Sequence, residues 1–69
     1  MENHIYKTIE LTGTSPNSIE EAVNRAVAKA SKSIENLRWF TVKEIRGHLK
    51  DNSVQEWQVT TKVSFTIKD

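Results

Sequence analysis

The chain has 69 residues, a formal net charge of +1 and no cysteine, so we expect one domain over residues 1–69, without disulfides or thiolate metal sites. The small net charge disfavours nucleic acid and anionic membranes as partners, and no apolar run approaches the roughly 20 residues that span a bilayer, so a cytoplasmic protein is expected. Because a domain this small buries only about 60% of the surface that its unfolded chain exposes, oligomerisation is the expected source of further stability.

The first predicted element is a short strand from Ile5 to Leu11. Apolar and polar residues alternate along it, and Lys7 interrupts the apolar face. The turn-forming cluster at residues 13–17 is expected to end the strand.

A helix is predicted to follow, with Ser18 as its N-cap. Glu21 completes a capping box, and acidic residues in the first turn suit the positive end of the helix dipole. Apolar residues then recur at spacings of three and four, which predicts an amphipathic helix of about 18 residues. These apolar residues are Ile19, Ala22, Val23, Ala26, Val27, Ala30 and Ile34.

Two long strands are predicted next, from Leu37 to Leu49 and from Val54 to Ile67, joined by a turn at residues 51–53. The first should be interrupted or bulged near Gly47. The pattern does not decide which face of this strand meets the helix. Strict alternation places Phe40 and Val42 on one face, and on the other Leu37, Trp39, Thr41, Lys43 and Ile45.

The order strand, helix, strand, strand indicates an α+β fold with one helix packed on a three-stranded antiparallel sheet. A crossover helix makes the first two strands run the same way, so the third strand, placed between them, makes every pairing antiparallel. The long strands reach over 40 Å at about 3.3 Å per residue, whereas the helix covers roughly 27 Å. The hairpin should therefore overhang the helix, which favours ordered self-association because exposed apolar strands aggregate.

The sequence contains no nucleophile elbow, phosphate loop or catalytic dyad, so we expect a protein that is not an enzyme. Trp39 has two interpretations, as core or subunit contact, or as a stacking platform for a planar ligand. Gln58 is either a solvated strand residue or an amide that reads the edge of a heterocycle. Arg46 is either a surface charge or a phosphate contact.

Taken together, four segments resemble the dodecin family in order and spacing, and the resemblance covers nearly the whole chain. These segments are Tyr6–Ser15, Asn36–Phe40, Glu44–His48 and Trp57–Thr60. The resemblance implies a helix partly wrapped by a three-stranded antiparallel sheet, with twelve subunits assembled into a hollow shell.

The resemblance also implies the ligand and its contacts. Pairs of flavins are expected at twofold axes between symmetry-related tryptophans, here Trp39, with Gln58 bonded to the isoalloxazine edge and Arg46 near the phosphate of FMN. Thr66 stands where bacterial members often have a second arginine, which leaves the preference for FMN over riboflavin open. The implied function is non-catalytic storage or buffering of flavin and quenching of its photochemistry.

Three points stay open at the level of sequence. Coenzyme A is a weaker implied ligand, with Lys29, Lys32 and Ser33 as candidate contacts. The alternative function is an oligomeric protein-interaction or structural module without flavin, whereas an RNA-binding module is disfavoured by the lack of a basic stripe. Which flavin is carried in the cell, and whether a partner receives it, is not determined.

Overall fold

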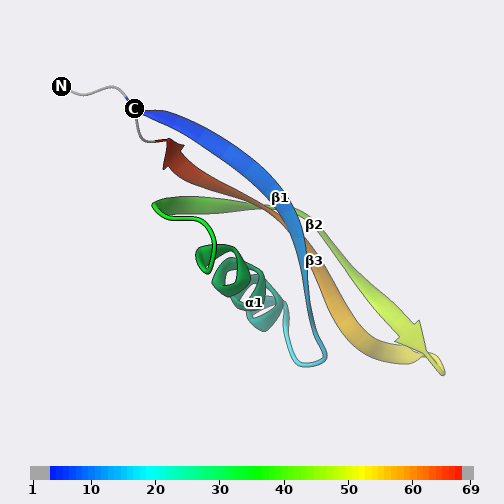
Figure 1. The fold of residues 1–69 in the computed structure, drawn as a ribbon. Helices are drawn as coiled ribbons and strands as arrows, with labels where there is room; N and C mark the ends of the chain where they lie inside the picture. The colour runs from blue at the N-terminus through cyan, green and yellow to red at the C-terminus, as the bar shows by residue number, and fades with distance from the viewer. Residues whose placement is uncertain (1–3, 68–69) are drawn as a thin grey trace.

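A computed structural model describes residues 4–67. Its elements are β1 (Ile5–Ser15), α1 (Ile19–Ser31), β2 (Leu37–Lys50) and β3 (Ser53–Ile67). The strands form one antiparallel sheet in the order β1-β3-β2, and α1 lies against one face of it, mainly on β1 and β3 (Figure 1). The predicted fold class, element order and strand order are confirmed.

β1 is longer than predicted, because residues 13–15 continue the strand instead of ending it. Gly13 and Ser15 pair with Val59 and Trp57 of β3, and both are buried. A Cβ at Gly13 would collide with the carbonyl oxygen of Ala22 in α1. Gly13 is therefore required for close approach of strand and helix, a use of glycine that its turn-forming neighbours conceal in the sequence.

The helix begins as predicted, but only half of the capping box forms. The Ser18 hydroxyl accepts a hydrogen bond from the Glu21 backbone N–H at 3.0 Å. The Glu21 carboxylate bonds instead to the hydroxyl of Ser15 and to the side-chain amide of Asn17, while the Ser18 N–H donates to the Ser15 hydroxyl at 3.3 Å. The hydrogen bond from Ser15, and then that from Asn17, lowers the pKa of Glu21 below its ordinary value of 4.5.

The helix has 13 residues and so is shorter than the predicted length. Ile34, the last residue of the predicted apolar stripe, lies beyond its end, because the chain turns back into β2 through Asn36 with a φ of 66°. The rest of the stripe packs as expected. The buried apolar residues are small: Ala22, Val23, Ala26 and Ala30 of the helix and Val59 and Val63 of β3.

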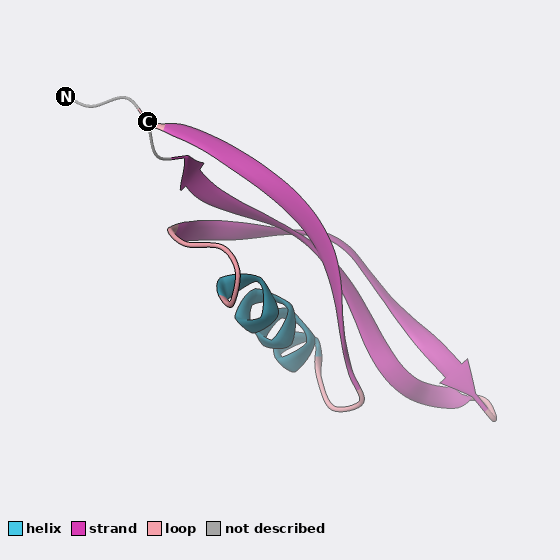
Figure 2. Ribbon diagram, in the orientation of Figure 1, coloured by secondary structure: helices cyan, strands magenta, loops and turns pink. Residues whose placement is uncertain are grey.

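The hairpin of β2 and β3 turns at Asp51 and Asn52, whose φ angles of 53° and 64° are typical of a tight two-residue connection. Beyond the helix the two strands continue as a long arm, as Figure 2 shows. No described helix is long and apolar enough to cross a membrane.

The single chain is unusually extended for its size. Its radius of gyration is 14.3 Å, whereas a compact domain of this length has about 11 Å. Its accessible surface is 5316 Å², against about 4,400 Å² for a monomer of this mass. The predicted overhang is therefore confirmed. The single chain also leaves apolar side chains in water. Those on the strands include Ile5, Phe40, Val42, Ile45, Leu49 and Val54.

Candidate functional site

Two bulges in β2 decide which of its side chains share a face. The pairing with β3 skips one residue at Arg38 and another at Lys43, and a further irregularity follows His48. Each skipped residue reverses the alternation, so the predicted grouping of Trp39 with Leu37 and Ile45 is wrong. Gly47 itself pairs in register, and the irregularity predicted near it comes one residue later.

The register assigns Trp39, Arg46 and Gln58 to one face of the sheet. Gln58, which pairs with Arg46, and Ser64, which pairs with Trp39, are next to Val59 and Val63 along β3, and these two valines are buried against α1. We call the face that points away from α1 the outer face. It carries Tyr6, Thr8, Glu10 and Thr12 of β1, Trp39, Thr41, Glu44 and Arg46 of β2, and Gln58, Thr60, Lys62, Ser64 and Thr66 of β3.

Trp39 lies on the outer face and is 48% exposed. The ring of Tyr6, from β1, contacts it at a centroid distance of 4.8 Å and an interplanar angle of 63°. Trp39 shares its row across the sheet with the small side chains of Ser64 and Thr8, whose hydroxyls are hydrogen-bonded at 2.9 Å. The indole is thus held from one side, with about half of its surface available to a planar ligand.

Arg38 also lies beside Trp39, and it was not predicted from the sequence as a site residue. It is the unpaired residue of the first bulge, and its Nε donates a hydrogen bond to the hydroxyl of Thr66 at 2.9 Å. This contact places Arg38 on the outer face beside Trp39, where strict alternation would separate the two. Tyr6 was not predicted as a site residue either, because only the pairing register relates its strand, two strands away in the sheet, to Trp39.

Gln58 and Arg46 form one hydrogen-bonded group. The Arg46 Nε donates to Gln58 Oε1 at 2.7 Å, and Gln58 Nε2 donates to a carboxylate oxygen of Glu56 at 3.0 Å. A second carboxylate, that of Glu44, lies 3.8 Å from the Arg46 guanidinium. These contacts fix the orientation of the Gln58 amide and leave it one N–H and one lone pair for a ligand.

The predicted site residues share a face but not a pocket within one chain. Arg46 pairs with Gln58, whereas Trp39 pairs with Ser64, six residues further along β3. At about 3.4 Å per residue the two groups are about 20 Å apart. The structure therefore brings Arg46 and Gln58 together and leaves Trp39 separate from them.

Hollows in the described part of the chain lie elsewhere. An apolar groove of about 600 Å³ between α1 and β2 is lined by Ile19, Val23, Val27, Phe40 and Val42, with Glu20 and Asn24 at its edge. It shows that the face of β2 bearing Phe40 and Val42 is the one turned toward the helix, which the sequence pattern left open.

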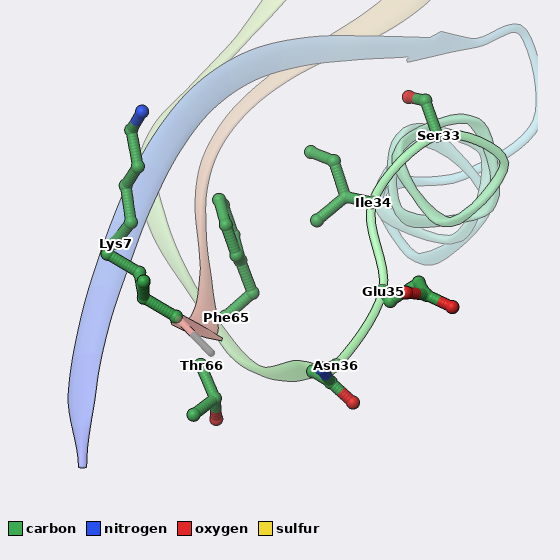
Figure 3. Close-up of a pocket in the computed structure, with 8 residues that line it drawn as sticks. Lys7, Ser33, Ile34, Glu35, Asn36, Phe65 and Thr66 are labelled. Atoms are coloured by element: carbon green, nitrogen blue, oxygen red, sulfur yellow. The ribbon is translucent and has the colours of Figure 1, made fainter. Parts of the chain in front are cut away.

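A second groove, of about 450 Å³, lies at the end of the helix (Figure 3). Ile34 and Phe65 point into it, whereas Thr66 points to the other side of the strand. Ser33 lines this groove, but Lys29 lines a different, smaller one and Lys32 lines neither. These groove linings do not test the candidate contacts for coenzyme A, and that ligand stays a prediction.

Within residues 4–67 no group of three histidines or carboxylates is placed to hold a metal ion.

Known proteins resemble this chain over nearly its full length. A family model described as Dodecin matches residues 5–68. A dodecin from Thermus thermophilus is 43% identical over 65 residues, which is 94% of each chain. A calcium dodecin from Mycobacterium tuberculosis is 31% identical over 64 residues, or 93% of this chain and 90% of that one.

Solved structures agree with the sequence comparison. The dodecin from Streptomyces davaonensis has a TM-score of 0.93 at 40% identity and covers 99% of this chain and 100% of its own. A tryptophan-to-phenylalanine variant of the Thermus protein has a TM-score of 0.92 at 40% identity, covering 97% of this chain and 100% of its own. The fold of that relative therefore survives the loss of an indole.

Proposed function

This chain belongs to the dodecin family, and we propose that it is a non-catalytic flavin-binding protein that stores or buffers FMN and riboflavin and quenches their photochemistry. The observation that carries the proposal is the indole of Trp39, which is half exposed on the outer face and held from one side by Tyr6. A large aromatic side chain presented in this way is suited to stacking against a flat ring system.

The other outer-face groups fit the remaining parts of a flavin. Its pyrimidine edge carries both donors and acceptors, and the oriented amide of Gln58 has one of each left after its bonds to Arg46 and Glu56. The phosphate of FMN suits a guanidinium, which can bind it with two parallel hydrogen bonds. Bound flavin supplies a chromophore whose excited state is quenched by electron transfer from a contacting indole.

A second copy of the chain is needed to complete this site, because Trp39 and Gln58 are about 20 Å apart in one subunit. We propose that the copies assemble as a hollow dodecamer in which two Trp39 side chains enclose a pair of flavins. Supporting this, the apolar groove that contains Phe40 and Val42 is open, and the single chain exposes 5316 Å² of surface. A second copy that covers the groove removes these side chains from water.

The test is a titration of FMN fluorescence with purified protein, with the mass of the assembly measured in the same samples. We expect quenching that saturates at one flavin per chain, in a particle of about twelve times 7.9 kDa. An assembly of that mass that leaves FMN fluorescence unchanged would support the alternative, a structural or interaction module. A monomer that leaves the fluorescence unchanged would contradict both.

A further inference from the structure

Arg38 has a position on the outer face that the three predicted site residues do not explain. It is the residue that the register of β2 with β3 skips at the first bulge, and its side chain reaches across to Thr66. Thr66 pairs with Tyr6, and the neighbouring row contains Trp39 and Ser64. The Arg38 guanidinium therefore lies next to the proposed stacking surface.

The charge of Arg38 is not neutralised within the described part of the chain. Two other basic residues of β2 have carboxylate partners, since Lys43 lies 3.3 Å from Glu10 and Arg46 lies 3.8 Å from Glu44. Among residues 4–67, Arg38 has no such ion pair, and its one side-chain hydrogen bond is to a neutral hydroxyl. Its positive charge is available to a ligand.

We propose that Arg38 binds the phosphate of flavin mononucleotide and makes the site prefer FMN to riboflavin. The inference rests on the proposed function, because it assumes that flavin stacks on Trp39. Thr66 is a positioning residue in this proposal. Its bond to Nε holds the plane of the guanidinium and leaves the two terminal nitrogens, which form the fork that matches two phosphate oxygens.

The experiment measures the dissociation constants of FMN and riboflavin for the assembled protein and four variants. Arg38→Ala should weaken FMN binding about tenfold, equivalent to about 1.4 kcal/mol, and leave riboflavin binding unchanged. Arg38→Gln, which keeps a donor for Thr66 but no charge, should lose the same preference. Thr66→Val should weaken FMN binding about threefold, because the charge remains but its orientation is lost. Arg25→Ala, which removes an exposed arginine from the helix, is the matched control and should change neither constant.

The outcomes separate this inference from the function on which it rests. If neither flavin binds the wild-type protein, the proposed function fails and the inference fails with it. If both flavins bind and their ratio is the same in wild-type, Arg38→Ala and Arg38→Gln proteins, only the role of Arg38 is refuted. An equal loss of FMN preference in Arg25→Ala would also refute it, because the effect would then be one of net charge.

Discussion

Replacement of Trp39 by alanine tests the stacking surface, and its effect can be calculated from the exposure of the indole. Trp39 is 48% exposed, which for an indole side chain leaves about 120 Å² for a ligand to cover. At about 25 cal/mol per Å² this area is worth at most about 3 kcal/mol. Stacking of bases on aromatic side chains is worth about 1–3 kcal/mol. We therefore expect Trp39→Ala to weaken FMN binding by about 2 kcal/mol, or about 30-fold.

The assay is the FMN titration, followed by both fluorescence intensity and lifetime. Bound FMN should regain fluorescence in Trp39→Ala, because the side chain that quenches it is gone. The assembly should persist, since Trp39 contributes little to the core and a relative with a replaced tryptophan keeps the fold. Trp57→Phe is the control, because Trp57 lies on the helix-facing side of β3. Unchanged affinity and quenching in Trp39→Ala would refute the assignment of Trp39.

Three further predictions concern folding and assembly. In urea melts at equal chain concentration, Gly13→Ala should lower the free energy of unfolding by about 1–3 kcal/mol, because the added methyl meets a helix carbonyl. The control variant Gly47→Ala should change this free energy by less than about 0.5 kcal/mol. The Ser15 hydroxyl lowers the pKa of Glu21, so the wild-type chain should be more stable than Glu21→Gln above pH 4.5 and lose that advantage as pH falls through the lowered pKa. A difference between their thermal melting temperatures that does not change with pH would contradict this. Phe40→Lys should still fold, by circular dichroism, because Phe40 is 50% exposed in one chain. Its mass should be that of a monomer, because a charge is costly in a covered groove. An unchanged assembly mass would show that the groove is not an interface.

Local signals in the sequence determined the element types, their order and the long hairpin. Ser18 caps the helix because its own hydroxyl reaches a nearby backbone N–H, a contact that needs no other part of the fold. The alternation in β3 identifies a strand with one buried face, and Asp51 and Asn52 tolerate the positive φ angles of the turn. The overhang also followed from sequence, since it depends only on the relative lengths of the elements.

The predicted ends of β1 and α1 were wrong, because residues distant in the sequence decide where these elements end. Gly13 looks like part of a turn, but it stays in the strand because β3 extends far enough to pair with it and α1 packs directly on it. The helix stops at Ser31 although apolar periodicity continues to Ile34, because the chain must turn back to begin β2. Local pattern carries no information about either constraint.

The arrangement of the candidate site was decided by tertiary structure alone. Trp39, Gln58 and Arg46 were identified from sequence, but an alternating pattern separates Trp39 from Arg46. The bulge at Lys43 brings them to one face, and the bulge at Arg38 places that arginine beside Trp39. A bulge inserts one residue where a strand must curve to follow its partner, and each insertion exchanges the two faces. The sequence therefore determined which residues are available for binding, and the pairing of β2 with β3 determined which of them meet.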